Sequence, residues 1–406
     1  MRTASGTVLL ISNGHGEHVV GARIAAALRA RAPALRILAL PTVGPGEAYA
    51  DGPAVRIGPS RALPSGGLTV RDPAHLWADL RSGFLDLTWR QARTLRAQRV
   101  DAVVSVGDVW AETLGSLPGA PARMAVQTLV SVRMMGGPAP LGLRAFRERF
   151  TAPERQLLRR AYRVAYVRDA ESARWLRARG VPARFAGNPM MDGLDAAPFA
   201  LDGEGPRLVL LPGSRGYAPA AVRTMFDVLA RLPAVTAVLP WPEGAPALPD
   251  PADWRPLPGP EGTRAWRRGR RYVQATARGL APALAWADIA LGTTGTAQEQ
   301  AAGRGVPVVT FPVPGAIPLG FLRTQRRVLG DALEIVTDGP DAAARAVRRL
   351  AVDPAERARR GAIGRARMGP PGGAAAIADD LLRRTYAADD AMGPPGQVAY
   401  APGEEP

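Results

Sequence analysis

A short loop and helix near the end of this sequence carry residue types that suit a nucleotide site. The stretch "LGTTGTAQEQAAGRGVPVV", residues 291–309, places a Gly/Thr loop before a helix-like segment with one acid, Glu299. Glycine lets a ligand approach the backbone, and a helix N-terminus offers free N–H groups. A carboxylate one turn into the helix could bind the hydroxyls of a ribose. A tight turn with a surface glutamate fits the same letters equally well.

A second loop has the composition of a phosphate site. In "LLPGSRG", Ser214 and Arg215 stand between a strand-like and a helix-like segment. A hydroxyl, a guanidinium and a helix N-terminus together bind phosphate oxygens, and could stabilise a diphosphate leaving group without a metal. The sequence has no Asp-x-Asp metal motif. The competing interpretation is an exposed arginine in a turn.

The first glycine-rich loop, "SNGHGEH", puts an imidazole and a carboxylate after an apolar strand-like segment. It is not a G-x-G-x-x-G dinucleotide motif, because the next glycine after Gly16 is Gly21. A purely structural turn needs neither group, so we expect this loop to face a ligand. Its candidate residues are Asn13, Gly14, His15, Gly16 and Glu17.

Asp108 follows another apolar segment in "VGDVWAE". An acid at the carboxyl end of a strand can act as a general base. Aspartate is also a preferred N-cap of a following helix. The sequence alone supports both roles equally.

Strand-like and helix-like segments alternate along the chain, which predicts an α/β protein with parallel sheets covered on both faces. The alternation stops at a polar Gly/Pro-rich stretch after 187–195 and restarts at "RLVLLPGSRG". We therefore expect two successive α/β domains. Residues 241–270, rich in Pro, Gly, Trp and Arg, are expected to be irregular, and 391–406 to form a disordered tail.

Composition excludes several kinds of chemistry. The chain has no cysteine, only three histidines and no lysine among its 52 basic residues, so thiol nucleophiles, P-loops and pyridoxal phosphate sites are excluded and a histidine-rich metal site is not expected. The net charge of +16 favours phosphorylated substrates or anionic membranes. The arginines are spread along the chain without interleaved aromatics, so no nucleic-acid partner is expected. Without a long apolar run, we expect a cytoplasmic protein.

Five motifs in order resemble the GT-B glycosyltransferases, most closely the lipid A disaccharide synthase family and its related proteins. They are "GNPMMD" at 187–192, "LLPGSR" at 210–215, "GTTGTAQEQAAGRGVPVV" at 292–309, "TQRRVLGD" at 324–331 and "RMGPPGGAAAIADDLL" at 367–382. The resemblance covers roughly residues 5–390. It implies a GT-B fold, with two Rossmann-like domains facing across a cleft.

The resemblance also implies domain limits and roles for residues. It implies an acceptor domain at 1–195, a nucleotide-sugar domain at 196–372 and a closing helix at 373–390 that returns to the first domain. Glu299 would hold the ribose, helped by Gly295 and Thr296. Ser214 and Arg215 would contact the diphosphate, Gln325 would lie near the donor sugar or phosphate, and Asp108 would be the base. No metal or other cofactor is implied.

The implied activity is inverting transfer of a sugar, of the N-acetylhexosamine type, from a UDP-sugar to a lipid-linked or glycolipid acceptor. The first loop departs from the true synthases, which carry an acid where this chain has His18. A UDP-sugar 2-epimerase and a non-catalytic nucleotide-sugar-binding protein are the alternatives. Residues 130–150, which include Met134, Met135 and Phe146, could form a peripheral contact with anionic membrane at the inner face of the cell membrane. The competing interpretation is an ordinary loop and helix packed on the domain.

Overall fold

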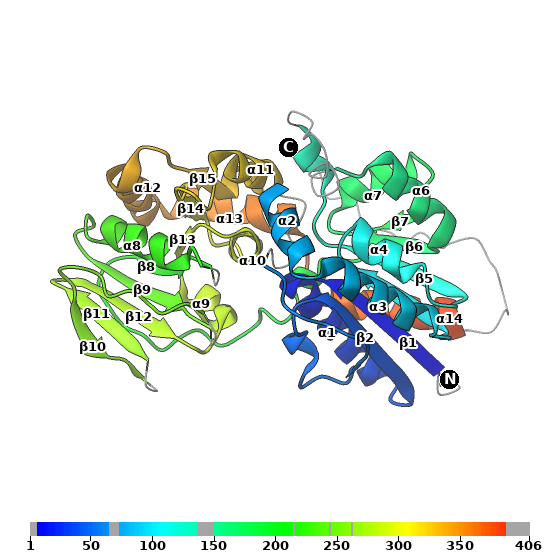
Figure 1. Ribbon diagram of the computed structural model, residues 1–406. Helices are drawn as coiled ribbons and strands as arrows, with labels where there is room; N and C mark the ends of the chain where they lie inside the picture. The colour runs from blue at the N-terminus through cyan, green and yellow to red at the C-terminus, as the bar shows by residue number, and fades with distance from the viewer. Residues whose placement is uncertain are drawn as a thin grey trace.

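The computed structural model describes residues 6–64, 73–136, 149–213, 216–242, 245–260 and 263–386. Two sheets, each covered by helices on both faces, lie side by side (Figure 1). This arrangement confirms the predicted α/β class and the two Rossmann-like domains. The domain limits at 195, 372 and 390 remain predictions. None of the helices in these ranges is long and apolar enough to cross a bilayer.

The first domain contains a seven-stranded parallel sheet in the order β3-β2-β1-β4-β5-β6-β7. Its central strands β1 and β4 are largely apolar and almost entirely buried, as expected for a parallel sheet that helices cover on both faces. The strands are β1 Gly6–Asn13, β2 Leu35–Val43, β3 Val55–Arg56, β4 Ala102–Val106, β5 Ala122–Gln127, β6 Val164–Val167 and β7 Ala183–Arg184. The helices are α1 His15–Arg31, α2 Pro73–Arg81, α3 Phe84–Arg96, α4 Val109–Gly115, α6 Ala152–Ala161 and α7 Ala170–Arg177, with short 3₁₀ turns η1 Glu47–Tyr49, η2 Val132–Gly136 and η4 Pro189–Met191.

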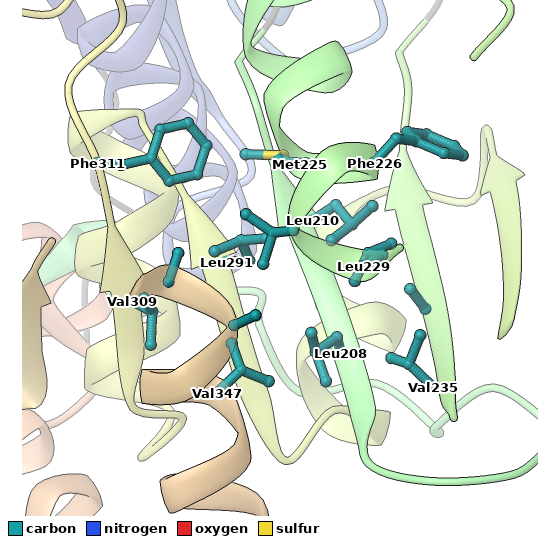
Figure 2. Packing of buried hydrophobic residues seen from close by; sticks show 14 of the residues in the cluster. Leu208, Leu210, Met225, Phe226, Leu229, Val235, Leu291, Val309, Phe311 and Val347 are labelled. Carbon is teal, nitrogen blue, oxygen red and sulfur yellow. The ribbon is translucent and has the colours of Figure 1, made fainter. Parts of the chain in front are cut away.

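The second domain contains an eight-stranded sheet in the order β10-β11-β12-β9-β8-β13-β14-β15. Its strands are β8 Arg207–Leu211, β9 Val235–Pro240, β10 Arg255–Pro258, β11 Arg264–Arg268, β12 Arg271–Thr276, β13 Ile289–Gly292, β14 Val308–Thr310 and β15 Leu333–Ile335. Its helices are α8 Ala218–Leu229, α9 Leu280–Trp286, α10 Gly295–Gly303, α11 Leu319–Leu329, α12 Gly339–Val352 and α13 Pro354–Met368, with η6 at Gly330–Ala332. Alternate residues of β8, such as Leu208 and Leu210, point into a core closed by α8 and α12 (Figure 2).

The expectation of irregular structure over 241–270 is wrong in part. Strands β10 and β11 form an antiparallel extension at one edge of the second sheet. The edge position tolerates the prolines of β10, because a proline there removes no central hydrogen bond. Trp254 and Trp266 are buried against Phe226, and this packing holds the extension on the domain.

The chain crosses between the domains twice, and the two crossings lie side by side. Asn188, at the first crossing, donates its backbone N–H to the Pro370 carbonyl and its side-chain amide to the Met368 carbonyl, both at 2.9 Å. After the second crossing, α14 (Gly373–Tyr386) packs against α1 of the first domain. Helix α14, the last in the described ranges, therefore belongs to the core of the first domain.

Asp380 anchors α14 to the first sheet. Its carboxylate accepts hydrogen bonds from the Tyr166 hydroxyl and from the guanidinium groups of Arg184 and Arg384. Burial alone would raise the pKa of Asp380, but the Tyr166 and Arg384 contacts outweigh it and hold the pKa at about 2. The stabilisation is therefore present above the pKa of an unfolded aspartate, near 4, and is lost as the pH falls toward 2.

We expect Asp380→Asn to lower the free energy of unfolding by about 1–2 kcal/mol at pH 7, after allowance for partial solvent screening. The difference from the wild type should shrink as the pH falls from 4 to 2, because the wild-type carboxylate is then protonated. Chemical denaturation at several pH values measures this. Asp379→Asn, on the exposed face of the same helix, is the control and should cost less. A constant difference at all pH values would contradict the assignment.

Candidate functional site

Asp108 lies at the carboxyl end of β4, directly opposite Asn13 at the end of β1. The Asn13 amide donates to both carboxylate oxygens of Asp108, at 3.1 and 3.3 Å. The Trp110 backbone N–H donates to Oδ1 of Asp108 at 3.0 Å, so Asp108 is the N-cap of α4. The cap predicted from the sequence is therefore present. The role as base remains a prediction, and these contacts would hold the carboxylate in one orientation for it.

The residues of the first glycine-rich loop turn directly into a helix. We expected a loop through His18, but α1 begins at His15. The turn is possible because Gly14 has a φ of 104°, a conformation that side chains rarely adopt, and a Cβ there would lie 2.8 Å from the Glu17 carboxylate. Glu17 is buried in the first turn of α1, where a negative charge is favourable, whereas His15 and Gly16 are exposed.

A cavity of about 190 Å³ lies beside this turn. It is lined by His15, His18, Val43, Gly44, Pro45, Gly46, Glu47, Ala62 and Leu63. Burial, with the nearby His15 as a second cause, lowers the pKa of His18 to about 4, so its imidazole is neutral at pH 7. Within the described part of the chain, the buried Nε2 atom of His18 has no hydrogen-bond partner. A neutral imidazole with one nitrogen that lacks a described partner therefore stands in the cavity wall.

Two fully buried glutamates lie behind Asp108, and the sequence analysis missed both. The amide nitrogen of Gln127 donates to Oε1 of Glu112 and to Oε1 of Glu154, the latter at 2.8 Å. Burial raises the pKa of Glu112 well above its usual value and that of Glu154 to about 8. Glu154 also forms a capping box with Thr151 at the start of α6, and this "TAPE" pattern was the available sequence signal.

Among the residues that the structure describes, no side chain caps the N-terminus of α10, and polar atoms without a partner lie beside it. Thr294, the N-cap, makes no capping bond, and its hydroxyl oxygen is buried without a partner among the described residues. Gln325 of α11 is 5% exposed, and its Oε1 atom is also without a described partner. A Cβ at Gly295 would lie 3.6 Å from the Gln325 amide nitrogen. These groups can satisfy a polar ligand at the helix N-terminus, where the dipole favours an anion.

The loop after β8 also reaches this point. Gly213 has a φ of 93°, and a Cβ there would lie 2.5 Å from the Thr294 methyl carbon. The two loops singled out in the second domain therefore meet at the N-terminus of α10, with Thr296 exposed nearby. Ser214 and Arg215 themselves lie outside the described residues.

Glu299 is buried and forms an ion pair with the first domain. Its carboxylate contacts the Arg168 guanidinium, with Nη2 to Oε2 at 3.1 Å and Nη1 to Oε1 at 3.4 Å. Arg168 follows β6 and also donates to the Thr128 carbonyl at 3.3 Å. The carboxylate expected to hold a ribose is therefore already engaged. Sequence analysis missed Arg168, although it stands at a strand end, in "YVRDAE", like the other candidates.

The segment expected as a membrane patch lies partly inside the domain contact. Met134 is 9% exposed and belongs to a cluster with Val328 and Met368 of the second domain, so the expectation that it faces a membrane is wrong. Arg133 donates to the Arg367 carbonyl at 2.8 Å. These contacts follow from the position of η2 beside α11. Phe146 lies outside the described residues.

No three His, Cys, Asp or Glu side chains in the described ranges are placed to hold a metal ion together. The groups that could bind an anionic ligand are instead helix N–H groups, an amide and arginine. The helix N–H groups at the start of α10 and the amide of Gln325 belong to the second domain, and Arg168 belongs to the first.

No protein-family model and no curated protein matches this chain. Solved structures do match it over nearly its whole length. The MurG protein of Acinetobacter baumannii is 16% identical, with 93% of this chain and 99% of that chain covered and a TM-score of 0.56. CalG4, the calicheamicin glycosyltransferase, is 18% identical, with 95% and 100% covered and a TM-score of 0.58. The UDP-GlcNAc 2-epimerase of Neisseria meningitidis, bound to UDP-GlcNAc, is 12% identical, with 93% and 100% covered and a TM-score of 0.53. The predicted GT-B fold is confirmed.

The buried glutamates predict a pH dependence of stability. Glu154 keeps its proton in the folded state up to about pH 8, whereas an unfolded glutamate loses it near pH 4. Between these values the folded state binds more protons, so this group makes the free energy of unfolding fall with rising pH, by up to about 1.4 kcal/mol per pH unit. We expect Glu154→Gln, which can keep the capping box, to remove part of this slope.

Denaturation curves at pH values between 5 and 8 measure the slope. Glu171→Gln is the matched control, because the guanidinium of Arg133 lowers the pKa of Glu171 and that group does not titrate in this range. An unchanged slope in Glu154→Gln would contradict the protonated state assigned to the glutamate pair.

Proposed function

We propose that this protein is an inverting glycosyltransferase that moves a sugar from a UDP-sugar to a lipid-linked or glycolipid acceptor. The observation that supports this best is the N-terminus of α10, where the described residues provide no side-chain cap, beside the Gln325 carbonyl, which has no partner among them. It suits a diphosphate or sugar and lies on the second domain, while Asp108 lies at the strand ends of the first. The GT-B fold, shared with glycosyltransferases, agrees with this division.

The donor would exchange partners with the Arg168–Glu299 ion pair. A nucleoside diphosphate carries a vicinal diol, which can donate to Glu299, and negative phosphates, which can replace Glu299 as the counter-ion of Arg168. Arg168 would then keep a counter-ion and Glu299 would keep hydrogen-bond donors, which matters because a buried charge without partners is very costly. Ser214, Arg215, Gly295 and Thr296 are proposed as further contacts of the diphosphate and ribose, and Gln325 as a contact of the sugar or phosphate.

In the proposed reaction, Asp108 removes the proton of an acceptor hydroxyl. The acceptor oxygen forms a bond to the anomeric carbon as the bond to the UDP oxygen breaks, and UDP leaves with the electron pair. The Asn13 amide would orient the carboxylate of Asp108, because it contacts both of its oxygens. The dipole at the N-terminus of α10 and Arg215 would stabilise the charge on the leaving diphosphate. Closure of the two domains would align the reactants and exclude water.

The finer proposals concern the sugar and the acceptor. We propose an N-acetylhexosamine as the sugar and transfer at the inner face of the cell membrane, without a metal. The cavity beside His18, Asn13, Gly14, His15, Gly16 and Glu17 is the proposed acceptor side. The second candidate is a UDP-sugar 2-epimerase, because such enzymes share this fold. An epimerase would convert a UDP-sugar without an acceptor, whereas a transferase would release UDP only when an acceptor is present.

We expect Asp108→Asn to reduce sugar transfer by at least about 100-fold, since general base catalysis contributes this much or more. The variant should bind UDP with nearly unchanged affinity, because Asp108 belongs to the other domain. Transfer from UDP-N-acetylglucosamine to membrane-extracted lipids, followed by mass spectrometry, measures the first effect, and calorimetry the second. Asp169→Asn, another N-cap at the end of a strand of the same sheet, is the control for replacing a charged cap with a neutral one. Loss of UDP binding in Asp108→Asn would contradict the assignment of Asp108 as the base.

The exchange at Glu299 predicts a difference between uridine and UDP. In Arg168→Met/Glu299→Gln, which removes both buried charges, we expect UDP affinity to fall about 10–100-fold while uridine affinity changes less, because a lost phosphate contact to a charged group costs about 1.5–3 kcal/mol. Glu299→Gln alone should weaken uridine more than UDP, because the phosphates of UDP then pair with an Arg168 that has lost its counter-ion. Arg133→Met, another arginine at the domain contact, should leave both unchanged.

Thermal shift and calorimetry against UDP, uridine, GDP and buffer, without metal, measure these effects. Stabilisation of the wild type by UDP establishes the donor class. If no uridine nucleotide stabilises the wild type, the proposed function is wrong. If UDP binds but the double variant discriminates UDP from uridine as the wild type does, only the exchange is wrong.

A further inference from the structure

The largest exposed apolar side chains gather on one pair of helices. In the described part of the chain, five large apolar side chains are strongly exposed, and three of them are on α2 and α3: Trp77 at 59%, Leu85 at 66% and Trp89 at 60%. The other two, Val55 and Val352, stand alone on β3 and α12. Tryptophan is a large, costly side chain to leave in water, so a cluster with two of them indicates a binding surface.

The exposed apolar face of α3 is separate from the face that holds the helix on its domain. Leu87, Gln91 and Leu95 are buried, and Leu95 packs against β1 and β2. Leu85, Trp89, Arg93 and Arg96 follow a spacing of four, four and three residues, which places them on the opposite side of the helix. The helix is therefore anchored without Leu85 and Trp89, and these two are free for a partner.

The charge around the tryptophans is positive. The Arg81 guanidinium lies over the Trp77 ring, 5.3 Å from its centroid, and the Arg93 guanidinium lies over the Trp89 ring at 5.7 Å. Asp86, an exposed acid on α3, is already paired with Arg90 at 3.0 Å. We call the exposed side chains Trp77 and Arg81 of α2 and Leu85, Trp89, Arg93 and Arg96 of the adjoining α3 the α2–α3 face. It combines apolar groups with a net positive charge.

We propose that the α2–α3 face docks the protein on an anionic phospholipid surface. Tryptophan rings favour the boundary between lipid headgroups and acyl chains, and leucine favours the acyl side. Arginines beside them can stay at headgroup level and contact lipid phosphates, each contributing to attraction by an anionic leaflet. The combination matches a membrane surface in both its apolar and its charged layer. It gives the membrane contact a place different from residues 130–150.

The α2–α3 face is joined to the proposed acceptor side by direct packing. Phe84, the first residue of α3, contacts the Trp110 ring at 5.6 Å, and the Trp110 backbone holds Asp108. Leu87 packs with Val43 and Leu63, which also line the cavity beside His18. In the view of Figure 1, α2 stands at the side of the first domain that is nearest the second. A lipid-linked acceptor would therefore leave the membrane next to Asp108. This role for the acceptor rests on the proposed function, whereas docking on the membrane does not depend on it.

Flotation with vesicles tests the docking. The wild type is mixed with vesicles of phosphatidylcholine alone or of phosphatidylcholine with phosphatidylglycerol, without donor or acceptor. We expect flotation only with phosphatidylglycerol, and less at high salt. The variant Trp77→Ser/Leu85→Ser/Trp89→Ser should lose it, and Arg81→Gln/Arg93→Gln should bind about fivefold more weakly for each arginine removed. Val352→Ser/Arg345→Gln/Arg348→Gln on α12, also exposed and with the same change of charge, is the matched control and should float like the wild type.

Melting temperatures and UDP affinity, measured on the same samples, show whether each variant is folded. Wild type that floats with neither vesicle, or apolar and arginine variants that float as well as the control, would overturn the docking. If the apolar variant is unfolded, the arginine variant decides. Flotation without any response to uridine nucleotides would leave the docking in place and overturn only the proposed function.

Discussion

The ion pair between Arg168 and Glu299 is the contact on which the geometry of the candidate site depends. Both side chains are buried, and they come from different domains. Removing one member would leave an uncompensated charge in a dry environment, so the two domains are held in register at this point. Glu299 lies on α10, the helix whose N-terminus carries the other polar groups that lack a partner among the described residues. The position of that N-terminus relative to Asp108 is therefore fixed by two charges rather than by apolar packing alone.

In the first domain, the buried acids near the candidate site are held by amide and backbone N–H groups rather than by a guanidinium. Asp108 receives hydrogen bonds from a side-chain amide and a backbone N–H, which together fix the orientation of its side chain. Glu112 and Glu154 behind it share one neutral amide, Gln127, and burial raises the pKa of both. Protonated glutamates add no negative charge near Asp108. The carboxyl ends of β1 and β4 thus hold an oriented carboxyl group in front of a buried, largely neutral pair.

Much of the fold could be predicted from the sequence because its central strands are continuous apolar runs. Strands β1, β4, β8 and β13 each appear as such a run followed by a polar loop. The edge extension around β10 was missed, because its prolines and arginines hide the alternation that buries Trp266. The start of α1 was also misplaced, since only the backbone angle of Gly14 shows that the helix begins at His15.

The candidate site was predictable only one loop at a time. The local composition around Asp108 and in the loop before α10 was enough to indicate both as candidates. Arg168 and Glu299 are 131 residues apart, and the sequence around either residue does not indicate that the two form a pair. The same holds for Glu112 and Glu154, which look like ordinary helix residues until a third residue, Gln127, brings them together. Long-range pairing of charges depends on the packing of whole domains, so a single sequence does not reveal it.

The two crossings between the domains restrict how they can move. Asn188 ties the first crossing to the second through two hydrogen bonds, and Asp192 ties it again at the backbone N–H of Ala374, at 2.8 Å. The two linked segments form a hinge. Rotation of the domains about a line through them can keep these hydrogen bonds, whereas sliding one domain past the other would break them all. A ligand that separates Arg168 from Glu299 would therefore open or twist the domains about one axis, and every residue at the far rim would move farther than those near Asn188.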